Sequence, residues 1–122
     1  AAGADRATAP RATILIPSYN HAPYILSCVQ SALDQTEPSI EILVIDDGST
    51  DDTLARLAAL EDPRLRVLAQ QNAGLSRTLN RGLRMARGRF VKFLPSDDML
   101  APDCIRRQLA VAQSTRGCAA IQ

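Results

Sequence analysis

An apolar run that stops abruptly at two aspartates constrains this sequence more than any other feature. The residues from Ile42 to Ile45 are followed at once by Asp46, Asp47 and Gly48. Four consecutive apolar residues are typical of a strand that is covered on both faces, as in a parallel sheet. Ligands of open α/β sheets bind where such strands end. The stretch therefore predicts a buried strand that delivers carboxylates to a ligand.

The rest of the chain alternates between strand and helix patterns. We expect further strands at 13–17, 65–69 and 89–94, and helices that begin near 23, 49, 75 and 102. Apolar residues at helical spacing predict the four buried helix faces, which are Ile25, Cys28, Val29, Ala32 and Leu33; Leu54, Leu57, Ala58 and Leu60; Leu75, Leu79, Leu83 and Ala86; and Ile105, Leu109 and Ala112. Ser49 and Asp52 have the spacing of a capping box for the second helix. The fold class is α/β, a Rossmann-like three-layer α/β/α arrangement with a mainly parallel four-stranded sheet.

Composition excludes several classes of protein. A hydrophobic content of 46% in 122 residues is enough for one compact domain, and no apolar run approaches the roughly 18 residues of a membrane span. Aromatic residues make up only 3%, which disfavours nucleic-acid binding. We expect a cytoplasmic chain with no membrane segment of its own, and leave membrane association of a longer native protein open. Residues 1–11 lack periodicity and are expected to be a loose leader.

The cysteines and the single histidine carry no pattern of a reactive site. Cys28, Cys104 and Cys118 are widely spaced, without a Cys-x-x-Cys pair, and are expected to be reduced packing residues of an intracellular protein. His21 has no second histidine nearby and is expected to be a turn residue rather than a metal ligand.

Acidic and polar residues follow three of the predicted strands. If the strands are parallel, the loops after the first, second and fourth strands emerge at one edge of the sheet. That edge would gather Tyr19 and Asn20, the Asp46-Asp47 pair, and the pair Asp97-Asp98. Four carboxylates oppose one another's ionisation unless a cation or a hydrogen-bond donor compensates them. A hard divalent ion, Mg²⁺ or Mn²⁺, is the natural partner.

Four motifs in this order carry a family resemblance. They are Ile16-Pro17-Ser18-Tyr19-Asn20, Val44-Ile45-Asp46-Asp47-Gly48-Ser49-Thr50-Asp51, Asn72-x-Gly74 with Asn80-x-Gly82, and Phe93-Leu94-Pro95-Ser96-Asp97-Asp98. Together they resemble the N-terminal, nucleotide-sugar-binding half of family 2 glycosyltransferases of the GT-A fold, over residues 13–103. The resemblance implies that 12–122 is the part of such a domain that binds a nucleotide-diphosphate sugar, with the acceptor half absent. It also implies a uridine donor, and transfer of the sugar with inversion to the hydroxyl of a carbohydrate or other acceptor.

The resemblance also implies a nucleotide site. Pro17, Ser18 and Tyr19, with Asn20 beside them, would line the nucleoside pocket. An acid of the next motif would accept a hydrogen bond from a uracil N–H, with Asp47 favoured over Asp46.

For the diphosphate, the resemblance implies a metal-binding Asp-x-Asp motif that contains Asp97, preceded by Ser96 and followed by Asp98. Arg77, near the start of the third helix after Gly74, is a candidate to assist the leaving diphosphate, although a solvated helix face also explains it.

Two departures from the family pattern matter. Pro95 stands where the common motif has an acid, so Asp97 is the one carboxylate of that motif that this chain retains. No catalytic general base is found in the chain, because no motif supports Asp62 or Asp103 in that role. The base is expected beyond Gln122. The chain should therefore bind nucleotide better than it catalyses.

Two other readings stay open. A non-catalytic nucleotide-sugar-binding module would also have Pro95 and lack the base. A phospho-acceptor signalling domain carries clustered aspartates on an α/β sheet too, but it is disfavoured because its acid pair should follow the first strand.

Overall fold

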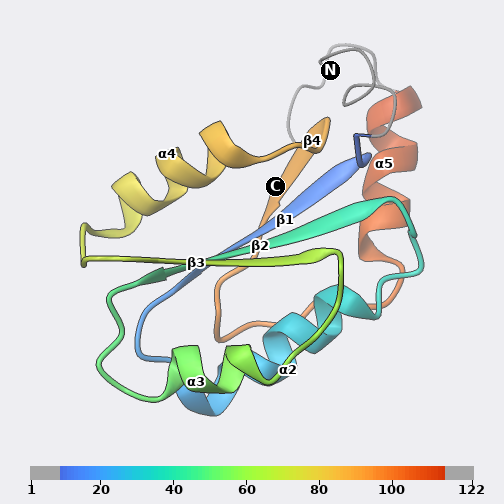
Figure 1. Ribbon diagram of the computed structural model, residues 1–122. Helices are drawn as coiled ribbons and strands as arrows, with labels where there is room; N and C mark the ends of the chain where they lie inside the picture. The colour runs from blue at the N-terminus through green and yellow to red at the C-terminus, as the bar shows by residue number, and fades with distance from the viewer. Residues whose placement is uncertain (1–8, 115–122) are drawn as a thin grey trace.

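The computed structural model describes residues 9–114. Its elements alternate along the chain: β1 (Ala12–Ser18), α2 (Ala22–Leu33), β2 (Ile40–Asp47), α3 (Thr53–Ala58), β3 (Leu65–Gln70), α4 (Leu75–Met85), β4 (Phe90–Phe93) and α5 (Cys104–Ser114) (Figure 1). This confirms the predicted alternation. Residues 1–8 of the predicted leader and Cys118 lie outside the described residues.

The four strands form one parallel sheet in the order β3-β2-β1-β4. This confirms the predicted fold class. Successive strands are added on one side of β1, and the chain then crosses to the other side to place β4. The order is that of the first half of a Rossmann sheet, whereas a flavodoxin-like domain has the order 2-1-3-4-5. The sheet therefore excludes the phospho-acceptor reading, which requires the flavodoxin-like order.

Side-chain alternation along β2 divides its residues between the two faces of the sheet. Ile42 and Val44 face one core cluster, and Leu43 and Ile45 face the other. The apolar run ends at Ile45, but β2 continues through Asp46 and Asp47. The two neighbouring carboxylates therefore point to opposite faces and meet different surroundings.

The two faces are covered unequally. Residues from α2, α3 and α5 pack on one face, and Ile105, Leu109 and Ala112 are buried there as predicted. Among the helices of residues 9–114, only α4 covers the other face, which Figure 1 shows above the sheet, opposite α2 and α3. Helices therefore flank the sheet on both sides, in the predicted three layers.

The buried face of α4 differs from the predicted leucine stripe. Thr78 and Gly82 are the buried residues, whereas Leu75 and Leu83 are 63% and 46% exposed. A Cβ atom at Gly82 would lie 2.4 Å from Cδ1 of Leu15. The helix thus approaches β1 most closely at a residue without a side chain, which leaves its leucines on the flanks of the contact.

A substitution at Gly82 tests this close approach. Leu15 is fully buried and cannot move aside freely, so Gly82→Ala should lower the free energy of unfolding by about 1–3 kcal/mol through overpacking. Leu83→Ala, one position along on the exposed side, is the matched control and should change little. Urea unfolding of both variants measures the effect. Stabilisation of Gly82→Ala by the higher helix propensity of alanine would contradict the packing.

The predicted face and cap of α3 are also wrong in part. Thr53 and Leu57 are its buried residues, while Leu54 and Ala58 are exposed. Asp52 precedes the helix without a side-chain cap bond, so the capping box does not form. Instead, the carboxylate of Asp51 accepts a hydrogen bond from the backbone N–H of Thr53 (3.0 Å).

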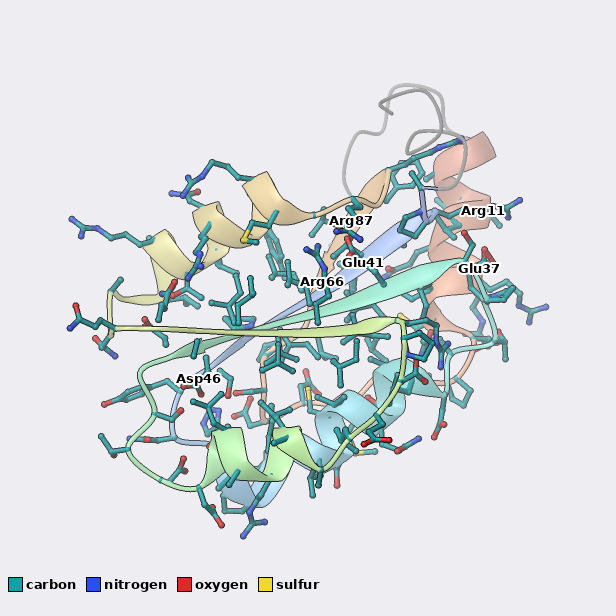
Figure 2. The ribbon with its side chains drawn as sticks, in the orientation of Figure 1. Arg11, Glu37, Glu41, Asp46, Arg66 and Arg87 are labelled. Carbon is teal, nitrogen blue, oxygen red and sulfur yellow. The ribbon has the colours of Figure 1, made fainter. Side chains whose placement is uncertain are left out.

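A buried carboxylate holds the amino edge of the sheet. Glu41 accepts hydrogen bonds from the Thr13 hydroxyl (2.7 Å), from Arg66 (2.9 Å) and from the backbone N–H of Arg87 (2.6 Å). Figure 2 shows these charged residues together at one end of the sheet, with Asp46 at the other. β1, β2, β3 and the connection to β4 are therefore tied together away from the motif loops.

The folded part of the chain also begins before the predicted end of the leader. The carbonyl of Pro10 accepts from the N–H of Arg89, and the N–H of Arg11 donates to the carbonyl of Ser39. Within residues 9–114, no helix is both long enough and apolar enough to cross a membrane.

Candidate functional site

A cavity of about 560 Å³ opens at the carboxyl edge of the sheet, between the ends of β1 and β4. This is the point where the strand order reverses, the usual ligand position in open α/β sheets. Six predicted site residues line it: Pro17, Ser18, Tyr19, Asp47, Gly74 and Ser96. Seven further lining residues were not predicted: His21, Asn72, Leu75, Thr78, Leu79, Phe93 and Pro95. The walls are therefore largely apolar, with a few polar groups, as in small-molecule sites.

The remaining predicted site residues do not line this cavity. They are Asn20, Asp46, Arg77, Asp97 and Asp98. Arg77 is exposed, and its side chain makes no hydrogen bond or ion pair with another residue of the described part. Asp97 and Asp98 follow Ser96, so they adjoin the wall that Ser96 forms.

Asp46 is committed to the fold of its own loop. Its side chain is fully buried on the face opposite Asp47, and its two carboxylate oxygens accept from the backbone N–H (3.0 Å) and the hydroxyl (2.6 Å) of Ser49. The buried charge is therefore satisfied by local donors. Because the Ser49 hydroxyl is bound to Asp46, it does not form the predicted helix cap.

Asn20 joins the loops that follow β1 and β2. It adopts a left-handed backbone conformation (φ 52°), and its side-chain oxygen accepts from the backbone N–H of Thr50 (2.7 Å). Its own N–H donates to the Ser49 hydroxyl (2.9 Å). Asp51 adds a second link, since it accepts from the N–H of Ala22 at the start of α2 (3.1 Å). These residues hold the cavity's loops in place from outside.

Asp47 is the buried carboxylate that faces the cavity. Its Oδ1 accepts from the Gln70 amide (2.9 Å) and the Ala73 N–H (2.7 Å), and its Oδ2 accepts from the Gly74 N–H (3.0 Å). Burial alone would raise the pKa of Asp47, but these hydrogen bonds outweigh it and lower the pKa below its usual value. Asp47 is thus an ionised acceptor on the cavity wall.

Acid should destabilise the fold through such carboxylates. The pKa of Asp62 is lowered by its hydrogen bonds with Arg64, as that of Asp47 is by its donors. Because these pKa values are lower in the folded chain, the unfolded chain takes up more protons as the pH falls. The contribution is complete above about pH 4, near the ordinary aspartate value, and is lost as the pH falls through the folded pKa.

Urea unfolding at pH 6, 4 and 3 measures this loss. The midpoint should fall between pH 4 and 3, and Asp62→Asn should show a smaller fall than the parent chain. A midpoint that stays constant down to pH 3 would contradict the assignment.

A buried hydroxyl in the wall has no partner. Ser18 is 1% exposed, and its Oγ makes no hydrogen bond with any residue of the part that the structure describes. A buried polar group without a partner costs free energy. A ligand in the cavity could supply that partner.

His21 is a cavity residue rather than only a turn residue. Its Nδ1 is hydrogen-bonded to the Ser96 hydroxyl, and its ring stands edge-on to Tyr24, with centroids 6.0 Å apart. The bond ties the loop after β1 to the loop after β4, across the cavity mouth. No local sequence pattern indicates the contact between His21 and Ser96, because the two residues are 75 positions apart.

The loop after β4 presents two exposed carboxylates. The N–H of Asp98 donates to the Pro95 carbonyl (3.0 Å) and closes a turn, which α2 supports because the Cys28 thiol donates to the same carbonyl (3.4 Å). Burial, with Asp97 and Asp98 nearby, raises the pKa of Cys28 to about 12. The thiol is therefore protonated and unreactive, in keeping with its predicted packing role.

The donor set of this loop fits a hard divalent ion that is completed by a ligand. Within residues 9–114, no group of three or more histidine, cysteine or acidic side chains could hold a metal alone. Mg²⁺, however, is commonly held by one or two carboxylates together with substrate phosphates and water. Asp97 and Asp98 are two such carboxylates, next to the cavity.

Comparison with known proteins identifies one matching family and several similar sequences and structures. The family model described as "Glycosyl transferase family 2" matches residues 13–122. A chondroitin synthase of Escherichia coli is 44% identical over 98 residues, which are 79% of this chain and 14% of that protein.

Two solved structures share the fold. S. aureus TarS 1–349 in complex with UDP-GlcNAc has a TM-score of 0.80 at 29% identity, and the match covers 85% of this chain and 31% of that one. Mannosyltransferase PcManGT from Pyrobaculum calidifontis, in complex with GDP-Man and Mn²⁺, has a TM-score of 0.70 at 31% identity over 84% of this chain and 31% of that one. The chain thus spans less than a third of the length of each of these three proteins.

Proposed function

Because the chain belongs to glycosyl transferase family 2, we propose that it is the donor-binding part of an inverting glycosyltransferase that uses a UDP-sugar and a divalent metal. The acceptor is a hydroxyl of a carbohydrate or a similar molecule, as in polysaccharide synthesis, in line with the name of the E. coli relative. The observation that carries the proposal is Asp47, an ionised acceptor on the wall of a mostly apolar cavity.

The nucleoside half of the donor occupies the cavity. Asp47 accepts an N–H of the base, and the role is assigned to Asp47 alone because Asp46 points to the other face and is bound to Ser49. Pro17 and Tyr19 pack on the nucleoside, and the buried Ser18 hydroxyl gains the partner that it lacks. The UDP-GlcNAc and GDP-Man complexes of the two structural relatives support a nucleotide-sugar ligand.

The diphosphate lies at the loop after β4. Asp97, with Asp98 beside it, would hold a Mn²⁺ or Mg²⁺ ion. When bound, this ion would neutralise the charge that develops on the departing diphosphate. Gly74 and Arg77 stand at the start of α4, where the helix dipole favours an anion. His21 keeps the Ser96 end of this loop against the cavity mouth.

Inversion requires direct displacement by the acceptor hydroxyl, with a general base to take its proton. We propose that this base lies outside residues 9–114. The described part then binds and orients the donor, and the remaining chemistry depends on sequence outside it.

Calorimetric titration of the chain with UDP, GDP and CDP, with and without Mn²⁺, tests the proposal. UDP should bind most tightly, and Mn²⁺ should strengthen its binding by about tenfold, which corresponds to roughly 1.4 kcal/mol. Asp97→Ala should remove the effect of Mn²⁺, whereas the exposed Asp52→Ala should keep it.

The outcomes separate the competing functions. A folded chain that binds none of the three nucleotides would overturn the donor-binding proposal. UDP binding that ignores both Mn²⁺ and Asp97→Ala would favour a non-catalytic nucleotide-sugar-binding module.

A further inference from the structure

Gln70 lies directly behind the carboxylate that faces the cavity. Asp47 and Gln70 are register partners at the ends of β2 and β3, so their side chains emerge side by side on the same face of the sheet. Nε2 of Gln70 donates to Oδ1 of Asp47 at 2.9 Å. Gln70 is not among the residues of the cavity wall. Gln70 therefore reaches a ligand only through the cavity residues to which it donates, Asp47 (2.9 Å) and Thr78 (3.0 Å).

A chain of hydrogen bonds sets the orientation of the Gln70 amide. Nη1 of Arg81 donates to Oε1 of Gln70 (2.8 Å), and an arginine has no acceptor. Oε1 is therefore turned toward α4 and Nε2 toward Asp47. The second hydrogen of Nε2 goes to the Thr78 hydroxyl (3.0 Å), whose own hydrogen goes to the Gly74 carbonyl (2.8 Å). In each of these hydrogen bonds, the donor and the acceptor are therefore fixed.

The acceptor sites of Asp47 can be counted. An ionised carboxylate has about four lone-pair sites. Gln70 and Ala73 occupy two on Oδ1, and Gly74 occupies one on Oδ2. The nearby Thr78 hydroxyl also helps to lower the pKa of Asp47, but its single hydrogen is donated to the Gly74 carbonyl (2.8 Å), so one site on Oδ2 is left over. A ligand can therefore offer Asp47 a single N–H or O–H, whereas a base with two adjacent donors would lack an acceptor for one of them.

We propose that Gln70, oriented by Arg81, is a positioning residue that occupies one acceptor site of Asp47 and leaves a single site for a base with one N–H, such as uracil. This inference rests on the proposed function and deepens it. It adds two residues that neither line the cavity nor were predicted from the sequence to be site residues. It also gives a reason for selecting uracil over guanine, which presents two adjacent donors.

The test compares UDP with 3-methyl-UDP, in which a methyl group replaces the single N–H of the base. The parent chain should bind UDP about tenfold or more tightly, since the hydrogen bond is made to a charged acceptor. Gln70→Met removes the donor behind Asp47 at similar volume and should reduce this ratio by about threefold or more. Gln71→Met is the matched control, because Gln71 is exposed and makes no contact with Asp47 in the described residues.

A second pair of variants keeps the test independent of folding differences. Gln70→Glu places a like charge against Asp47, so at pH 8 it should bind UDP about tenfold more weakly than Gln71→Glu, which adds the same charge one residue away. Arg81→Met should lower the UDP to 3-methyl-UDP ratio in the same direction as Gln70→Met, while the exposed Arg84→Met should not. Circular dichroism and urea unfolding verify that each variant is folded.

The results distinguish this inference from the proposed function. If the folded parent chain does not bind UDP, the proposed function fails. If the parent chain discriminates against 3-methyl-UDP but Gln70→Met and Gln70→Glu behave like their Gln71 controls, the positioning role fails alone. If the parent chain binds both nucleotides equally, the contact between Asp47 and the base is wrong, and the role of Gln70 falls with it.

Discussion

Replacing Asp47 by alanine should weaken UDP binding by about ten- to a hundredfold, the largest loss expected of any cavity residue. The reason is that a ligand N–H would lose a charged acceptor, and hydrogen bonds of this kind contribute about 1.5–3 kcal/mol. The same change leaves Ala73, Gly74 and Gln70 without their acceptor, so the loop before α4 should also lose its fixed position. Calorimetry with UDP measures the affinity, and urea unfolding measures the cost to the fold.

Two aspartates of neighbouring sequence serve as controls for Asp47→Ala. Asp52→Ala removes an exposed carboxylate and should leave both UDP binding and stability nearly unchanged. Asp46→Asn should lower stability more than affinity, since Asp46 holds Ser49 on the other face of the sheet. UDP binding that survives Asp47→Ala but is lost in Asp46→Asn would reverse the assignment of the two residues.

Replacing Glu41 by alanine should lower the free energy of unfolding by about 3 kcal/mol. The substitution breaks a mostly buried ion pair and leaves the positive charge of Arg66 without its carboxylate partner. Arg66 is 26% exposed, so water recovers part of its solvation, and the loss should lie toward the lower end of the range for buried pairs. Thermal or urea unfolding of the purified variant gives the value.

Glu61 offers a matched control, because it is an exposed glutamate without an ion pair in the described residues. Glu61→Ala should change stability by less than about 0.5 kcal/mol. The double variant Glu41→Ala with Arg66→Met should be less destabilised than the sum of the single changes, since each removes the other's partner. Additive losses, or a Glu41→Ala chain as stable as Glu61→Ala, would show that the pair does not hold the sheet edge.

Much of the fold was predictable because the spacing of apolar residues within each short segment distinguishes strands from helices. The run from Ile42 to Ile45 is apolar at every position, as a strand covered on both faces requires. What local patterns cannot show is where such a strand ends. The apolar run ends at Ile45, whereas the strand continues for two more residues, and this continuation sends Asp46 and Asp47 to opposite faces.

The buried faces of the shorter helices were harder to predict. Leucines at positions 75 and 83 look like core residues by spacing, but contact with β1 is made through Gly82. A glycine contributes nothing to a hydrophobic pattern, so its role as a contact point is invisible until the helix is placed on the sheet.

The candidate site was predictable to the extent that it lies in contiguous motifs. Asp47, Ser18 and Ser96 stand at strand ends, where the chain's own order indicates a ligand edge. His21 and Gln70 were missed because their partners, Ser96 and Asp47, are 75 and 23 positions away. Such contacts depend on the order and register of the strands, which cannot be predicted from local patterns in a single sequence.

The two buried acids of β2 have a consequence for how this scaffold could change. Glu41 and Asp47 lie six residues apart on the same face of one strand, which is about 20 Å. Glu41 ties the strands together and Asp47 is the proposed ligand contact, with the buried side chains of Leu43 and Ile45 between them. Loops around the cavity could therefore be exchanged or diversified for new donors while the anchored end keeps the scaffold folded. A library confined to residues 71–74 and 96–99 is the direct way to exploit this separation.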